Sequence, residues 1–74
     1  MGPHYEVEYL ALTGSLGRSE KQWARSVDYR SKPPRVRTWT SVEAAREFAR
    51  ARDDKWRIVR VDVDGSREVV DERL

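Results

Sequence analysis

The sequence contains no cysteine, only one histidine and no long apolar run. Without cysteine the chain can form neither a disulfide framework nor a thiolate metal site. It offers no candidate for a membrane-spanning helix, and the pattern of a signal peptide is missing as well. We therefore expect a cytoplasmic protein with no metal and no cofactor. Residues 1–74 are expected to form a single domain, which at this length buries only about 60% of the surface of its unfolded chain.

Motifs that signal catalysis are also missing. We find no glycine-rich phosphate loop, no nucleophile elbow and no histidine–cysteine cluster. Asp53-Asp54 and Asp71-Glu72 are adjacent acids, but general acid–base catalysis requires groups that converge in space, which adjacency in sequence does not provide. The sequence therefore predicts a non-enzymatic protein.

Net charge is small, at +2, but its distribution is uneven. Residues 18–37 contain seven basic residues and two acidic ones, whereas residues 1–17 and 61–74 carry more acid than base. A basic middle between acidic ends favours an acidic partner, which can be nucleic acid or the acidic surface of another protein.

The most clearly patterned segment is residues 40–52, T-S-V-E-A-A-R-E-F-A-R-A-R. Thr40 and Glu43 have the spacing of a capping box, in which each side chain bonds to the backbone N–H of the other residue. The apolar side chains recur at helical spacing, at Val42, Ala45, Phe48 and Ala49. We expect this helix to lie on a β-sheet, because segments with β-type patterns flank it on both sides.

Residues 4–12 alternate in polarity, with Tyr5, Val7 and Tyr9 on one face and Glu6 and Glu8 on the other, which predicts a half-buried strand. A loop is expected at residues 13–18. Residues 19–30 allow two interpretations. A capping box at residues 19–22 favours a helix, whereas alternation favours a strand over residues 23–30, which we prefer.

We expect a turn at residues 31–34 and a third strand at residues 35–39. After the helix, residues 56–63 show the strongest strand pattern of the chain, with Val59, Val61 and Val63 on one face. Asp64-Gly65 predicts a two-residue type I′ hairpin turn. That register places Arg67 opposite Asp62 and Val70 opposite Val59.

The resulting order, ββ(β)αββ, predicts an α+β fold of two layers. One layer is an antiparallel sheet of four or five strands, and the single helix packs on one of its faces. The expected core consists of Val7, Tyr9, Val36, Val42, Ala45, Phe48, Val59, Val61 and Val70.

Four basic residues, Arg30, Lys32, Arg35 and Arg37, fall within eight positions without an acid among them. If residues 23–30 pair with 35–39, Arg25 joins them on the outer face of a two-stranded ribbon. Such a ribbon fits the major groove of DNA, and the guanidinium fork matches phosphate and guanine edges. These five residues form the predicted nucleic-acid-binding set. A solvated, charged strand face is the other interpretation.

The aromatic residues suggest a different function. Trp23, Tyr29, Trp39 and Trp56 belong to a set of aromatic side chains too large for so small a core, and tryptophan and tyrosine are frequent interface anchors. The chain can therefore also be a protein–protein interaction module, as a homodimer, an adaptor or an inhibitor. The alternative is that these side chains line the core.

Three short segments carry a family resemblance: W-A-R-S-V-D-Y-R at 23–30, R-V-R-T-W-T at 35–40 and E-A-A-R-E-F at 43–48. Together, residues 23–49 resemble the AP2-like, arm-type DNA-binding domain of tyrosine integrases from phages and actinobacteria. The resemblance implies a sheet that enters the major groove and a helix that supports it. The chain departs from the family at Pro33-Pro34, where a glycine-rich turn is usual, and in the valine-rich hairpin that follows the helix.

Overall fold

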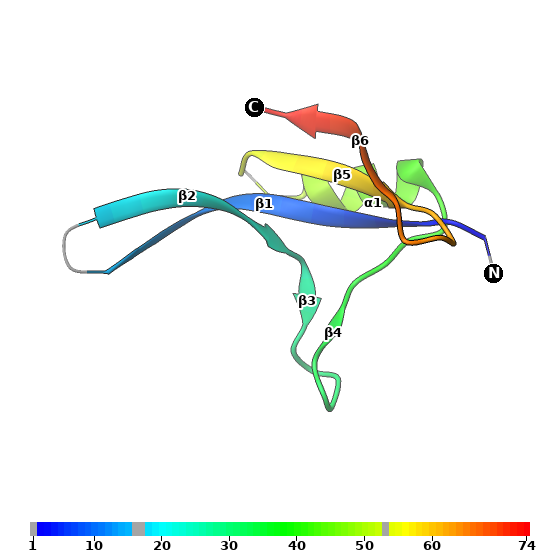
Figure 1. Ribbon diagram of the computed structural model, residues 1–74, viewed down its shortest axis with the longest axis horizontal. Helices are drawn as coiled ribbons and strands as arrows, with labels where there is room; N and C mark the ends of the chain where they lie inside the picture. The colour runs from blue at the N-terminus through cyan, green and yellow to red at the C-terminus, as the bar shows by residue number, and fades with distance from the viewer. Residues whose placement is uncertain (1, 16–17, 53) are drawn as a thin grey trace.

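The computed structural model describes residues 2–15, 18–52 and 54–74, with the side chains of 12–15 and 18–20 left out. A four-stranded antiparallel sheet has the order β2-β1-β5-β6. Its strands are β1 (His4–Ser15), β2 (Arg18–Arg25), β5 (Trp56–Val61) and β6 (Arg67–Arg73). The helix α1 (Val42–Arg50) packs on one face of this sheet (Figure 1). This confirms the predicted α+β, two-layer class.

Two further strands, β3 (Val27–Asp28) and β4 (Arg35–Val36), form a separate small sheet. They belong to a hairpin that projects from the main sheet (Figure 1). The hairpin leaves and rejoins the edge of β1. The Ser26 N–H donates to the Val7 carbonyl (2.9 Å), and Trp39 and Tyr5 exchange two backbone hydrogen bonds. The Arg37 N–H donates to the Ser26 carbonyl (2.8 Å) and so closes the base of the hairpin.

Residues 19–28 are extended and not helical, since β2 covers residues 18–25 and β3 follows at residues 27–28. The strand predicted over residues 23–30 ends earlier than expected, because residues 29–30 form a turn. The predicted loop at residues 13–18 is wrong at both ends, because residues 13–15 belong to β1 and Arg18 belongs to β2. Residues 16–17 of that prediction lie outside the described part. The predicted pairing of 23–30 with 35–39 is also wrong in extent. Only Val27 with Val36 and Asp28 with Arg35 pair in it, since residues 18–25 pair with β1 instead.

The N-cap of the helix lies one residue later than predicted, and α1 is shorter than the predicted range of residues 40–52. Its N-cap is Ser41, whose hydroxyl accepts a hydrogen bond from the Ala44 N–H (3.2 Å), so the expected capping box at Thr40 is wrong. The backbone bridge to Tyr5 holds the chain at Trp39, and the chain turns into the helix only after it. Within the described ranges, no helix combines the length and the apolar character needed to cross a membrane.

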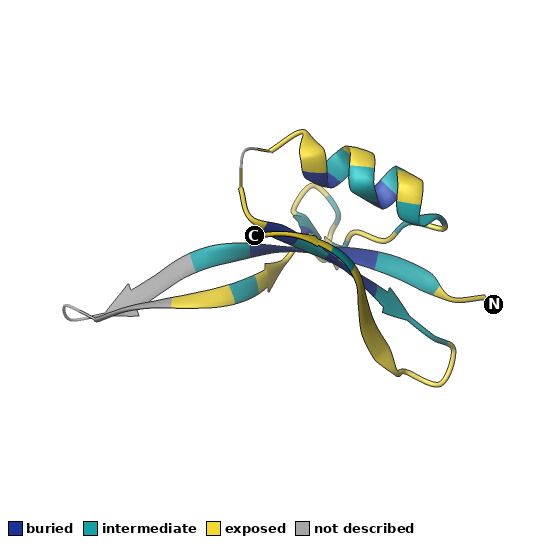
Figure 2. Cartoon of the chain, turned by 90° about the horizontal axis from the view of Figure 1, so that it is seen from above, coloured by how far each residue is buried: buried dark blue, intermediate teal, exposed yellow. Residues whose placement is uncertain are grey.

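The core lies where α1 crosses β1 and β5 (Figure 2). Ala45 and Ala49, both fully buried, allow the helix to approach the sheet closely, as the apolar pattern predicted. Their buried partners from the strands are Val7, Tyr9, Trp56 and Ile58. Val42 and Phe48 are only partly buried, and the Phe48 ring packs against Trp39 with 4.8 Å between ring centroids.

The predicted division of β5 into two faces is confirmed, and Val59 is buried as expected at 3% exposure. The prediction of which face meets α1 is wrong. The core side carries Trp56 and Ile58, and the opposite side carries Val59 and Val61. Sheet register explains the inversion. Ile58 is the cross-strand partner of Val7, so it must share the face on which Val7 meets the helix.

The β5–β6 turn also differs from the predicted type I′ turn. The Gly65 N–H donates to the Asp62 carbonyl (2.9 Å), the Asp62 N–H donates to the Ser66 carbonyl (2.9 Å), and Gly65 has φ +88°. This is a three-residue loop with glycine in the left-handed region. Arg67 therefore pairs with Val61 and not with Asp62.

A register shift between Ile58 and Val59 changes the pairing of β6 a second time. The three-residue turn already places Val59 opposite Val69 and not opposite Val70. The shift then leaves Val70 as the extra residue of β6, so that Ile58 pairs with Asp71. Val70 is consequently 41% exposed, contrary to the core assignment made from the sequence. Val36 and Val61 are only partly buried.

Candidate nucleic-acid interface

The predicted basic cluster lies mostly in the β3–β4 hairpin. Arg30, Lys32 and Arg35 are exposed there, and Tyr29 beside them has 79% of its surface accessible to solvent. The hairpin therefore presents three cations and an aromatic ring to solvent within one short segment.

Asp28 organises this hairpin from its first strand. Its Oδ1 atom accepts a hydrogen bond from the Arg30 N–H (3.0 Å) and lies 3.7 Å from Nη2 of Arg37. The Arg37 guanidinium also stacks over the Phe48 ring, 5.6 Å from its centroid. Arg37 therefore links the hairpin to α1, and its charge is compensated by Asp28.

The other three cations of the hairpin differ from Arg37 in this respect. Within the described part of the chain, Arg30, Lys32 and Arg35 form no ion pair with a carboxylate. Their charges are therefore available to an anionic partner without the loss of an internal contact.

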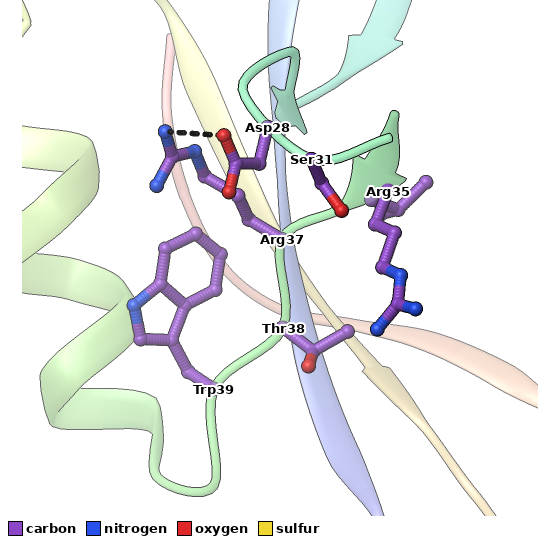
Figure 3. Close-up of a pocket in the computed structure, with 7 residues that line it drawn as sticks. Asp28, Ser31, Arg35, Arg37, Thr38 and Trp39 are labelled. Atoms are coloured by element: carbon purple, nitrogen blue, oxygen red, sulfur yellow. Dashed lines mark ion pairs between the residues drawn. The ribbon is translucent and has the colours of Figure 1, made fainter. Parts of the chain in front are cut away.

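A recess of about 320 Å³ lies at the base of the hairpin, between the tip turn and the chain that leads to α1. Figure 3 shows Ser31, Arg35 and Thr38 on one side of this chain segment. The Arg37 guanidinium, paired with Asp28, lies on the other side. The recess thus combines one unpaired guanidinium with two hydroxyl groups.

The structure separates Arg25 from the rest of the predicted set. Arg25 lies on β2 opposite Glu8 of β1, and its Nε atom is 3.5 Å from Oε1 of Glu6. It therefore belongs to a different surface, the face of the main sheet that is turned away from α1.

That face carries an ionic network which the sequence did not reveal. Glu6 and Glu8, each only 6% exposed, lie among basic side chains from all four strands. Arg57 Nε lies 2.5 Å from Glu8, Arg67 Nη2 lies 3.0 Å from both carboxylates, and His4 Nε2 lies 3.3 Å from Glu6. Alternation assigned the glutamates to the open face, but their partners are distant in sequence.

Three of the four predicted interface aromatics pack against the protein itself. Trp56 lies in the core and is 3% exposed, and Trp39 packs against Phe48. The Cζ atom of Arg57 lies over the Trp23 ring, 4.4 Å from its centroid. Tyr29 is the member of this set that projects into solvent.

Displaced pKa values occur outside the hairpin. Burial raises the pKa of Tyr9, a hydrogen bond from Arg46 lowers the pKa of Asp71, and the backbone N–H of Ser66 lowers the pKa of Asp64. None of these three residues lines the recess beside Arg35.

Across the described residues, no group of three or more His, Cys, Asp or Glu side chains is placed to hold a metal ion. No family model, curated protein or solved structure matches this chain. The resemblance of residues 23–49 to the DNA-binding domains of integrases therefore stays a prediction.

Proposed function

We propose that this chain is a non-enzymatic, intracellular nucleic-acid-binding domain and that the β3–β4 hairpin is its contact element. The observation that carries the proposal is the group of three uncompensated cations, Arg30, Lys32 and Arg35, on a hairpin that projects from the sheet. Neutralising phosphates with such side chains releases condensed counterions, which is the main source of sequence-independent affinity for nucleic acids. Tyr29 adds an exposed ring on which a base can stack.

The base of the hairpin is held in place before any ligand binds, which favours this function. The Arg37–Asp28 ion pair, the stacking of Arg37 on Phe48 and the backbone bridge between Trp39 and Tyr5 all hold it against the body. A contact element that is already ordered loses less conformational entropy on binding.

Fluorescence anisotropy with labelled duplex DNA, over a series of salt concentrations, tests the proposal. Three phosphate contacts give a slope of log K against log salt of about −2.7, at about −0.9 per phosphate. The triple substitution Arg30→Ala, Lys32→Ala and Arg35→Ala is expected to weaken binding at low salt by more than about ten-fold and to flatten this slope.

A matched control removes the same amount of charge from elsewhere. Lys21, Arg50 and Lys55 are exposed and lie outside the hairpin, so their joint replacement by alanine changes the net charge equally. This control is expected to retain most of the affinity. Absence of binding by the unmodified protein at low salt, or equal losses in the two triple variants, overturns the proposal. Circular dichroism checks that both variants are folded.

A protein–protein interaction is the second candidate, and one observation favours it. The edge strand β6 exposes Val69 (44%) and Val70 (41%), and Val63 and Leu74 near its ends are more exposed still. We propose homodimerisation through this edge as the alternative. Sedimentation at low and high concentration tests it: a dimer that Val69→Thr/Val70→Thr dissociates supports it, and a monomer at every concentration excludes it.

A further inference from the structure

We propose that the recess at the base of the β3–β4 hairpin binds one phosphate group. Arg35 supplies the charge, and the hydroxyls of Ser31 and Thr38 supply hydrogen bonds. The inference deepens the proposed function and rests on it for the ligand, which is a backbone phosphate of a nucleic acid.

Chemistry and size both suit this ligand. A guanidinium donates two parallel hydrogen bonds to phosphate oxygens, and each hydroxyl can donate one more. Figure 3 shows Ser31, Arg35 and Thr38 on the same side of the segment. These residues line a space of about 320 Å³. Among the described residues, none of these three side chains has a hydrogen-bond or ion-pair partner of its own.

The one carboxylate in the recess does not oppose an anion. Asp28 accepts a hydrogen bond from the Arg30 N–H (3.0 Å) and pairs with Arg37 (3.7 Å). Figure 3 shows that pair directed away from Arg35. The charges of Asp28 and Arg37 cancel, so Arg35 leaves the recess with one positive charge.

The hydroxyls distinguish this site from a simple cationic surface. A phosphate is tetrahedral and takes donors from several directions, whereas a planar carboxylate is matched by the guanidinium fork alone. Removing the hydroxyls without changing the charge therefore separates a phosphate recess from general electrostatic attraction.

Inorganic phosphate is the direct probe. In an NMR titration at constant ionic strength, with chloride as the reference anion, we expect saturable shifts at Ser31, Arg35 and Thr38. The double variant Ser31→Ala/Thr38→Val is expected to weaken phosphate binding at least about ten-fold, since it removes two hydrogen bonds to a charged group. Thr40→Val is the matched control, because Thr40 is exposed and lies outside this recess. If phosphate shifts no resonance in the recess, or shifts arginines throughout the molecule equally, the inference is wrong.

Binding to nucleic acid gives the second readout. Ser31→Ala/Thr38→Val is expected to lower the affinity at least about ten-fold with an unchanged salt slope, whereas Arg35→Ala reduces the slope by about 0.9. If the chain binds nucleic acid and the hydroxyl variant is unaffected, the recess is excluded and the proposed function stands. If the recess binds phosphate but the chain binds no nucleic acid, the proposed function fails and the recess serves another phosphate-bearing ligand.

Discussion

The Nη2 atom of Arg67 lies 3.0 Å from Oε2 of Glu8, although the two residues belong to strands that are not neighbours. Arg67 is on β6 and Glu8 is on β1, so the arginine side chain reaches across β5. Arg57 on β5 and Arg25 on β2 join the same network. The face of the sheet opposite α1 is thus covered by ion pairs that involve every strand, and not by a second apolar layer.

Neutralising Glu8 tests the contribution of this network to stability. Removal of one partner from a buried ion pair costs about 3–5 kcal/mol. Here the side chains of Arg57 and Arg67 are 29% and 34% exposed, which reduces the cost. We expect Glu8→Gln to lower the free energy of unfolding by about 2 kcal/mol, as measured by urea denaturation.

Glu68→Gln serves as the control, because Glu68 is exposed on β6. It is expected to change the free energy of unfolding by less than about 0.5 kcal/mol. Equal effects of the two substitutions would contradict a structural role for the network.

Tyr9→Phe is expected to stabilise the protein. The Tyr9 hydroxyl is buried and has no hydrogen-bond partner in the described part of the chain, while its ring lies 4.2 Å from the Arg52 guanidinium. An unsatisfied buried hydroxyl is destabilising, so its removal is expected to raise the free energy of unfolding by about 1 kcal/mol at neutral pH. A decrease on thermal or urea denaturation would show that the hydroxyl is satisfied in solution.

The raised pKa of Tyr9 leads us to expect a loss of stability at alkaline pH. Burial raises the pKa of Tyr9 above 10.0, partly offset by the positive charge of Arg52. Titration of Tyr9 therefore has no effect on stability well below pH 10, and the protein loses stability as the pH rises from 10 through the folded-state pKa, because the unfolded state releases the proton first. Tyr9→Phe is expected to lose less stability than the unmodified protein over that range.

The ion pair between α1 and β6 predicts an acid effect. Arg46 Nε donates to Asp71 Oδ2 (2.6 Å), and this hydrogen bond lowers the pKa of Asp71 below 3.8. The stabilisation is complete above pH 4 and is lost as the pH falls through the folded-state pKa. Because both side chains are about one-third exposed, we expect Asp71→Asn to cost only about 0.5 kcal/mol at neutral pH. In urea denaturation, the difference in the free energy of unfolding between the two proteins should disappear in acid. A difference that stays constant with pH would contradict a stabilising Arg46–Asp71 ion pair.

The position of the helix cap can be tested with two neighbouring substitutions. Ser41→Ala removes the side-chain acceptor for the Ala44 N–H and is expected to cost about 1 kcal/mol in thermal denaturation. Thr40→Ala is expected to cost less than about 0.5 kcal/mol, because Thr40 is exposed and precedes the cap. A larger loss of stability in Thr40→Ala than in Ser41→Ala would indicate that Thr40 is the cap, as predicted from the sequence.

Local patterns were sufficient to predict the layers of this fold. The spacing of Ala45 and Ala49 predicted the buried stripe of α1, and the alternation of Tyr5, Val7 and Tyr9 predicted the face of β1 that meets it. Both patterns arise within one element, so the sequence of that element contains the information.

Pairings between elements could not be predicted in the same way. Both faces of β5 are apolar near Ile58 and Val59, so only the pairing with β1 decides which side meets the helix. In the candidate site, the run of cations in the hairpin was visible in the sequence. The partners that neutralise Arg25 and Arg37 lie on other strands, so the sequence did not show which charges stay available.

Ser26 and Arg37 are hydrogen-bonded neighbours at the edge of β1, so the ten residues between them form a hairpin whose two ends meet outside the main sheet. We expect that their length and composition can change without moving any strand of the main sheet. We expect the main sheet to stay intact if another segment is grafted between Ser26 and Arg37, or if the ten residues are replaced by a two-residue Asn-Gly turn. On the proposed function, substitutions confined to this hairpin are expected to change ligand preference without changing the core.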